Sequence, residues 1–241
     1  MRTLVVGDIH SGLKALKQVL NKVGLQEEDH LIFLGDYVDG WSEAVPTVDF
    51  LIQLRSDYKC TFIRGNHDEL CMDWLFSGQD NPLWLQHGGR ATMDSYGKSD
   101  EITKEIHKNF YTSLENYFLD DQNRLFIHAG FTSLKGIDFE YFTKTFYWDR
   151  TLWELALALD PNLSPEDRFY PQRLSNYKEI FIGHTPVVRI GRTTPLNAAN
   201  VWNVDTGAAF KGPLTIMDAD TKEFWQSDLV YTFYPDETGR N

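Results

Sequence analysis

Three times within the first 80 residues, a short apolar run leads into a polar loop and then into a helical pattern. The runs Leu4–Val6, Leu31–Leu34 and Thr61–Ile63 are each followed by apolar residues at helical spacing. Such runs are typical of buried strands, and repeated strand–loop–helix units give right-handed crossovers and a parallel sheet. We therefore expect an α/β fold whose loops lie at the carboxyl ends of the strands, where ligands of α/β proteins bind.

The loops place acidic, amide and imidazole side chains next to glycine. The first three read Gly7-Asp8-Ile9-His10, Gly35-Asp36-Tyr37-Val38-Asp39 and Gly65-Asn66-His67-Asp68. Two later apolar runs, 125–127 and 180–182, lead into His128-Ala129-Gly130 and Gly183-His184. Mixed oxygen and imidazole ligands suit Mn²⁺, Fe or Zn²⁺, and two such ions about 3.5–4 Å apart need a bridging carboxylate. The sequence thus predicts a site for two divalent ions.

The rest of the chain is less regular. Residues 77–99 are rich in glycine and predict a long, partly helical excursion near the site. Four short runs predict a second, more antiparallel sheet: Arg189–Thr194, Asn200–Asp205, Leu214–Asp218 and Glu223–Gln226. The tail from Pro235 is polar, and we expect it to be mobile. No linker or internal repeat divides the chain, which predicts a single domain over residues 1–241.

The composition and net charge of the chain indicate which classes of binding partner are disfavoured. The chain has 241 residues, 42% of them hydrophobic, which is enough for a full core. Its formal charge of -12 disfavours a nucleic-acid polymer or an anionic membrane as partner, although a local metal cluster can still attract an anionic substrate. Cys60 and Cys71 are expected to be reduced packing residues, and no apolar run approaches 18 residues. We expect a cytoplasmic protein, with its oligomeric state open.

Taken in order, the five loop motifs resemble the five signatures of the calcineurin-like metallophosphoesterases. Their form is most similar to the phosphoprotein phosphatase branch, which includes eukaryotic serine/threonine phosphatases and phage lambda phosphatase. The similarity extends from Gly7 to about Asp205. The resemblance implies a two-sheet metallophosphatase sandwich flanked by helices (α/β/β/α). It also implies two divalent metal ions, with Mn²⁺ expected and Fe or Zn²⁺ as alternatives, and hydrolysis by a two-metal-activated hydroxide without a phosphoenzyme.

Carried over residue by residue, the resemblance implies a role for each polar loop residue. Asp36 would bridge the two metal ions. His67 would be the general acid that protonates the leaving oxygen, and Asp39 would hold and polarise it. The terminal metal ligands would be Asp8 and His10 for the first ion, and Asn66, His128 and His184 for the second.

The chain departs from the family pattern where the substrate's phosphate is bound. Many relatives carry an arginine directly after the second aspartate of their second motif, where this chain has Gly40. The family's other arginine often follows a tryptophan, and Arg150 in Trp148-Asp149-Arg150 fits that place. Arg90, in a glycine-rich segment, is a weaker candidate to replace the missing guanidinium.

These features predict a metal-dependent phosphomonoesterase acting on phosphoprotein serine or threonine esters, with tyrosine open. The alternative is a diadenosine tetraphosphatase-like nucleotide pyrophosphohydrolase, which Gly40 and Asp68 favour, because relatives that act on proteins often have glutamate where Asp68 stands. In that case Trp41 is a candidate for stacking on a base. A catalytically silent metal-binding or scaffold domain is a third hypothesis, which the intact ligand set disfavours.

Overall fold

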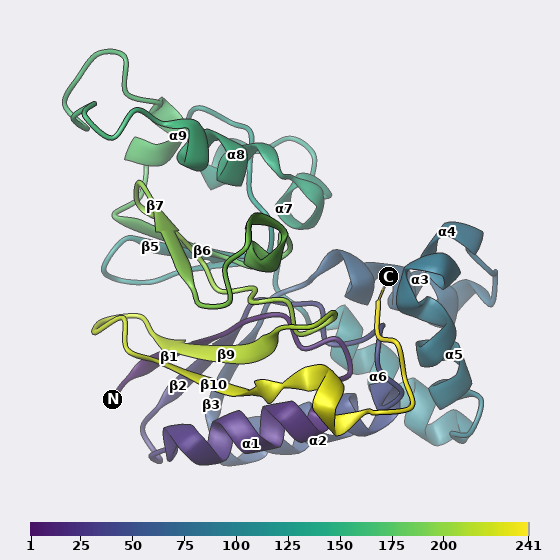
Figure 1. Cartoon of the computed structure of the whole chain (residues 1–241). Helices are drawn as coiled ribbons and strands as arrows, with labels where there is room; N and C mark the ends of the chain where they lie inside the picture. The colour runs from purple at the N-terminus through teal and green to yellow at the C-terminus, as the bar shows by residue number, and fades with distance from the viewer. Residues whose placement is uncertain (241) are drawn as a thin grey trace.

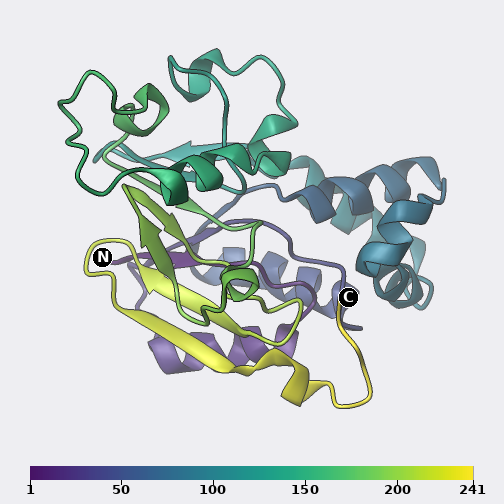
Figure 2. The same cartoon turned by 45° about the horizontal axis from the view of Figure 1, so that its top comes forward.

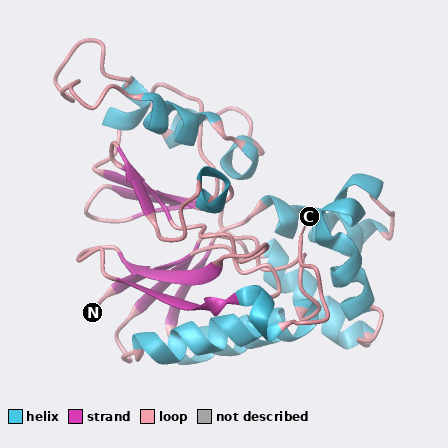
Figure 3. Ribbon diagram, in the orientation of Figure 1, coloured by secondary structure: helices cyan, strands magenta, loops and turns pink. Residues whose placement is uncertain are grey.

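Two β-sheets face each other, with helices on both outer sides (Figure 1, Figure 3). The structure is a computed structural model that describes residues 1–240. The first sheet has the strand order β10-β9-β1-β2-β3, and the second has the order β4-β5-β6-β8-β7. The predicted α/β/β/α sandwich is confirmed.

The first sheet is built on the three parallel strands that the sequence predicts. These are β1 (Thr3–Val6), β2 (His30–Phe33) and β3 (Lys59–Phe62). β9 (Pro213–Asp218) pairs antiparallel with β1, and β10 (Phe224–Leu229) pairs antiparallel with β9. The prediction that these last two strands belong to a second sheet is wrong. After the second sheet, the chain returns and β9 pairs with the free edge of β1. A short apolar run predicts a strand but does not indicate which strand it pairs with.

The second sheet has a parallel centre and antiparallel edges. Its central strands are β5 (Arg124–Ile127), β6 (Glu179–Ile182) and β8 (Val201–Asn203). The edge strands β4 (Tyr117–Leu119) and β7 (Leu196–Ala198) pair antiparallel with β5 and β8. The strand predicted at Arg189–Thr194 is absent from this described stretch, because residues Val187–Ile190 turn into the 3₁₀ helix η3 instead.

Helices cover the outer face of each sheet and extend the molecule on one side. In Figure 2, α8 and its neighbours lie over the second sheet, while the helices that follow β3 project beyond the sandwich. The helices are α1 (Leu13–Val23), α2 (Ala44–Asp57), α3 (Asn66–Ser77), α4 (Pro82–Trp84), the kinked segment η1 (Leu85–Gly89), α5 (Arg90–Tyr96), α6 (Glu101–Thr112), the 3₁₀ helix η2 (Ile137–Phe139), α7 (Thr145–Trp148), α8 (Thr151–Ala158), α9 (Gln172–Ser175) and the 3₁₀ helix η4 (Val230–Phe233). Residues 77–99 therefore form the partly helical excursion that the sequence predicts.

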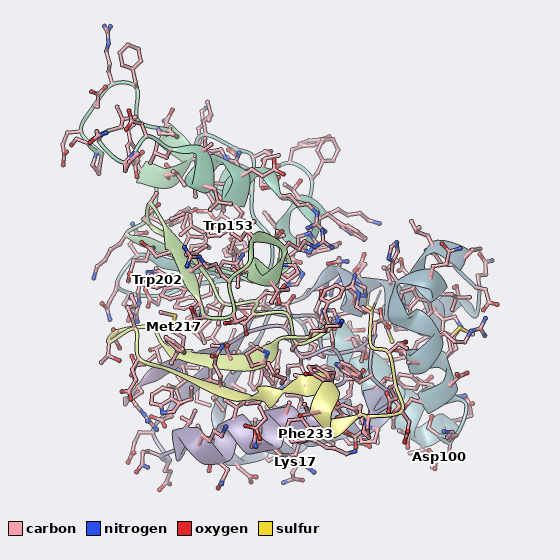
Figure 4. All side chains as sticks on the ribbon, viewed as in Figure 1. Lys17, Asp100, Trp153, Trp202, Met217 and Phe233 are labelled. Atoms are coloured by element: carbon pink, nitrogen blue, oxygen red, sulfur yellow. The ribbon has the colours of Figure 1, made fainter. Side chains whose placement is uncertain are left out.

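The apolar core has three parts, one between the sheets and one outside each sheet. Phe126 and Phe181 of the second sheet stack at 4.9 Å between ring centroids and pack against Met217 of the first. Met217 and Trp202 mark this inter-sheet layer in Figure 4. Each sheet is therefore buried on both faces, and the two sheets pack together through the inner layer. No described helix has the length and apolar character needed to cross a membrane.

Candidate active site

The five polar loops meet at the carboxyl ends of β1, β2, β3, β5 and β6. The Nε2 atom of His10 lies 3.6 Å from Oδ2 of Asp36, and Nε2 of His128 lies 3.5 Å from the same oxygen. The ligand atoms of Asp8, His10 and Asp36 all lie within 4.8 Å of one another, and so do those of Asp36, His128 and His184. The two groups share Asp36, which is the arrangement that two ions with a bridging carboxylate require.

The backbone orients two of these imidazoles. The Nδ1 atom of His10 lies 3.1 Å from the carbonyl oxygens of both Val38 and Asp39, and Nδ1 of His128 lies 2.8 Å from the carbonyl oxygen of Leu34. A carbonyl oxygen can only accept, so Nδ1 carries the hydrogen in both rings. The Nε2 lone pairs therefore face the site, as in histidines whose other nitrogen is fixed to bind a metal.

Electrostatics indicate that the site is built for cations. Burial raises the pKa of Asp8, and repulsion from Asp205 and Asp36 raises it further. Burial and repulsion from Asp36 likewise raise the pKa of Asp205 to about 6. Burial opposes ionisation of Asp36 as well, but the surrounding imidazoles lower its pKa overall. Burial also lowers the pKa of His10, which keeps its ring neutral. Buried carboxylates beside neutral imidazoles fit a pair of divalent ions.

The backbone at the site is held in uncommon conformations. His10, Asp36, Asp39 and His184 all have positive φ angles, of 50°, 54°, 71° and 66°. Such angles are costly for residues other than glycine and are found at functional sites. A Cβ at Gly65 would lie 2.1 Å from Oδ1 of Asp36, so only glycine fits there. The glycines and strained residues together bring the side chains into one cluster.

His67 and Asp39 form a buried pair beside this cluster. The Nδ1–H of His67 donates to Oδ2 of Asp39 at 2.6 Å. The same carboxylate accepts from Nε1 of Trp84 and from Oγ1 of Thr92, each also at 2.6 Å. The sequence predicts the His67–Asp39 pair but not these two supports, because both come from the excursion and neither lies in a recognisable motif. The Nε2 atom of His67 is left for a reacting group.

Three arginines line one cavity together with four of the candidate ligands, namely His10, Asp36, Asn66 and His184: they are Arg150, Arg189 and Arg240. None of them forms an ion pair with any residue in the range 1–240. The three guanidinium groups share one cavity, and the pKa of Arg150 is lowered by partial burial and by repulsion from Arg189 and Arg240. The structure brings Arg150 to the site as the sequence predicts. It does not bring Arg90 there, because that side chain is exposed on α5 and is not part of the cavity lining.

The comparisons with known proteins agree with this geometry. The profile of the calcineurin-like phosphoesterase family matches residues 1–210. The chain belongs to this family. It is a metallophosphoesterase, a hydrolase whose relatives act on phosphate esters and anhydrides.

Relatives of this metallophosphoesterase carry two kinds of name. It is 28% identical to an asymmetrical bis(5'-nucleosyl)-tetraphosphatase of Anoxybacillus flavithermus, over 88% of each chain. It is 26% identical to serine/threonine-protein phosphatase 1 of Salmonella typhimurium, over 88% of this chain and 89% of that one. A solved structure of a candidate diadenosine tetraphosphatase superposes with a TM-score of 0.64 at 16% identity, covering 93% of this chain and 92% of that one, which shows the fold alone.

Aromatic residues of this metallophosphoesterase divide into buried and exposed sets. Trp41 is fully buried, donates from Nε1 to the carbonyl oxygen of Ala208 and stacks on Tyr234. The suggestion that it stacks on a base is therefore wrong. Trp148, in contrast, is 44% exposed, and its ring centroid lies 6.4 Å from that of His184. An exposed aromatic surface thus begins directly beside the candidate metal ligands.

Proposed function

We propose that this metallophosphoesterase hydrolyses dinucleoside tetraphosphates, using two divalent ions with Mn²⁺ as the working metal. Of the two substrate classes that the sequence leaves open, the relatives support the nucleotide class better than the phosphoprotein class. The observation that carries the proposal is a cavity with three guanidinium groups that have no ionic partner, beside an exposed aromatic groove whose Trp148 ring lies 6.4 Å from that of His184. We keep a cytoplasmic location in the proposal, because Cys60 and Cys71 are free thiols.

The arginines suit a chain of phosphates. A single phosphoryl group is neutralised by the metal ions and one or two guanidinium groups, whereas a tetraphosphate carries about four negative charges along its length. Arg189 lies on η3 and adds a third positive group at the cavity. In a protein with a formal charge of -12, three arginines without carboxylate partners form a local attraction for a polyanion.

The aromatic groove suits a nucleobase. It is lined by Tyr141, Phe142 and Trp148, which are 85%, 67% and 44% exposed, together with Lys144. The rings of Tyr141 and Phe142 meet edge to face at 4.8 Å. Stacking of a base on an aromatic side chain is worth about 1–3 kcal/mol. Trp148 lies between this groove and the metal centre, so a base can stack there while its phosphates enter the cavity.

The proposed roles of the site residues follow from their geometry. The metal ions, when bound, supply Lewis-acid activation of water and neutralise phosphoryl charge. His67, held through Nδ1 by Asp39, gives a proton from Nε2 to the leaving oxygen. Arg150, whose Nη1 is 3.1 Å from Oγ1 of Thr185, binds the phosphoryl group. The proposed ligands are Asp8, His10 and Asp36 for one ion and Asp36, Asn66, His128 and His184 for the other.

The test compares the two substrate classes on one preparation. Mn²⁺-loaded protein is assayed with diadenosine tetraphosphate and with phosphoserine, phosphothreonine and phosphotyrosine peptides, and the products are separated by chromatography. We expect kcat/KM for the dinucleotide to exceed that for the peptides by about 100-fold. Formation of ATP and AMP would assign asymmetrical cleavage, and formation of ADP alone would assign symmetrical cleavage. Faster hydrolysis of a peptide would replace this proposal by the phosphoprotein one.

A Trp148→Ala variant tests the groove directly. It should raise KM for the dinucleotide about 10-fold, through lost stacking, while leaving KM for p-nitrophenyl phosphate unchanged. Trp225→Ala, on β10 and outside both the cavity lining and the groove, serves as the matched control. An equal rise in KM for both substrates would mean that Trp148 supports the metal site and does not bind a base.

A further inference from the structure

The segment after η4 folds back to the active site, although the sequence predicts a mobile tail. In Figure 1 this yellow segment runs from η4 toward α3. We call residues 234–240 the C-terminal arm. Its first ring, Tyr234, stacks on Trp41 at 5.1 Å and 17°. The Glu237 carboxylate then accepts from the backbone N–H and the hydroxyl of Ser42, at 2.9 and 2.7 Å. These contacts attach the arm to the residues that follow the second metal motif.

The arm ends in a guanidinium that faces the candidate metal ligands. The backbone N–H of Arg240 donates to the carbonyl oxygen of Ala209 at 2.9 Å. Its Nη1 lies 3.3 Å from Nε2 of His10, and its guanidinium lies over the ring of Phe210 at 5.4 Å. The Nε atom is buried and has no hydrogen-bond partner among residues 1–240. A partly buried positive charge without an acidic partner is costly unless an anion binds there.

The stem of Arg240 fills the space in front of residue 40. Gly40 has φ of +112°, and a Cβ built on it would lie 3.4 Å from Cγ of Arg240. A Cβ on Gly88 would lie 3.1 Å from the same atom. The two glycines also meet directly, because the Gly40 N–H donates to the Gly88 carbonyl at 3.3 Å. Side chains at these positions are excluded by backbone angle or by space, and the arginine stem passes between them.

We propose that Arg240 binds the phosphoryl group of the substrate together with Arg150, so that the C-terminal arm supplies a second guanidinium in front of Gly40. Both arginines line one cavity with Asp36, His67 and His184. Two guanidinium groups in one cavity would bind the oxygens of a phosphoryl group that point away from the metal ions. The inference rests on the metal centre of the proposed function but not on its nucleotide substrate.

The experiment measures phosphate binding as well as turnover. Arg240→Ala, Arg240→Lys and the charge control Arg168→Ala, on an exposed loop, are each loaded with Mn²⁺. Calorimetry gives the affinity for inorganic phosphate, mass spectrometry gives the manganese content, and p-nitrophenyl phosphate gives kcat and KM. We expect Arg240→Ala to bind phosphate about 10- to 100-fold more weakly with two Mn²⁺ retained. The phosphate affinity of Arg240→Lys should lie between those of the wild type and Arg240→Ala, because lysine keeps the positive charge but cannot donate two parallel hydrogen bonds as a guanidinium does.

Two results would overturn the inference. If Arg240→Ala binds phosphate as tightly as Arg168→Ala does, Arg240 does not contact the phosphoryl group. If Arg240→Ala loses manganese, or melts well below the control, the residue supports the fold or the metal site. Neither result depends on which ester is the natural substrate. A failure of the nucleotide proposal would appear only in the comparison of dinucleotide with peptides, where the Arg240 variants are not used.

Discussion

At the scale of single residues, the orientation of His67 is fixed by a buried set of hydrogen bonds through Asp39. Asp39 is fully buried, and its two carboxylate oxygens accept from His67, Trp84 and Thr92. The donors from the excursion hold the carboxylate, and the carboxylate in turn holds the imidazole. The ring is thus fixed with Nδ1 bonded and Nε2 directed at the cavity.

Asp39→Asn should therefore impair proton donation without removing metal. An asparagine carries no charge, so it stabilises the doubly protonated ring, which gives the proton from Nε2, less than the Asp39 carboxylate does. We expect kcat to fall about 100-fold with an alkyl phosphate and less with p-nitrophenyl phosphate, whose leaving group hardly needs a proton. Steady-state kinetics and manganese content measure the two effects. Asp94→Asn, on the exposed face of α5, is the control, and equal losses on both esters would contradict the acid role of His67.

Site residues that belong to local motifs can be predicted from the sequence. The sequence predicts that Asp8, Asp36 and His67 lie together, because each follows an apolar strand within two to four residues, and the structure brings them together. Arg240 and Trp84 were not predicted. They reach the site through long-range packing, of the arm on Trp41 and of the excursion on Asp39, and no local pattern specifies such a contact.

At the scale of elements, the loop after β2 is tied to the start of α3 by one side chain. The carboxylate of Asp68 accepts from the backbone N–H groups of Asp36, Tyr37 and Gly65, each at 2.8 Å. The N-terminus of α3 and Asp36 are thus fixed relative to each other. The strands themselves were predictable from their apolar runs. The sheet to which β9 and β10 belong could not be predicted in this way, because the pairing partner of a strand depends on the path of the chain between distant elements.

A buried histidine links β2 to β3 and should make stability depend on pH. The Nε2 atom of His30 lies 2.9 Å from Oγ1 of Thr61, and burial, helped by repulsion from Lys59, lowers its pKa from 6.5 to about 4. Between these values the unfolded chain binds a proton and the folded chain does not, so stability falls as the pH drops from 6.5 toward 4. The loss attributable to His30 is up to about 3 kcal/mol.

Urea unfolding of metal-free protein at pH 7 and at pH 4.5 measures this effect. His30→Gln cannot titrate, so its loss of unfolding free energy on acidification should be smaller than that of the wild type by about 2 kcal/mol. His87→Gln, which changes an exposed histidine, should lose as much as the wild type. The idea fails if His30→Gln and the wild type lose the same free energy between the two pH values.

At the scale of the whole molecule, the candidate metal centre lies where the two halves of the sandwich meet. Asp8, Asp36 and Asn66 follow strands of the first sheet, whereas His128 and His184 follow strands of the second. Away from the site, Arg124 on β5 also reaches across, to Asp220 after β9, at 2.6 Å. Metal ions bound between Asp36 and the two histidines would thus connect elements that are otherwise joined mainly by the inter-sheet apolar layer.

Metal removal should consequently lower the thermal stability of the whole fold. Ions that bind only the folded state stabilise it by about 4 kcal/mol at a 1,000-fold excess over Kd, which for a chain of this size raises Tm by on the order of 10 °C. Scanning calorimetry with EDTA and then with restored Mn²⁺ measures the shift. Asp36→Ala removes the ligand shared by both groups, so its Tm should hardly respond to Mn²⁺. Glu101→Ala, which changes an exposed side chain at the start of α6, should respond like the wild type. A wild-type Tm that is the same with and without Mn²⁺ would mean that the ligands of the two sheets do not hold a common metal centre.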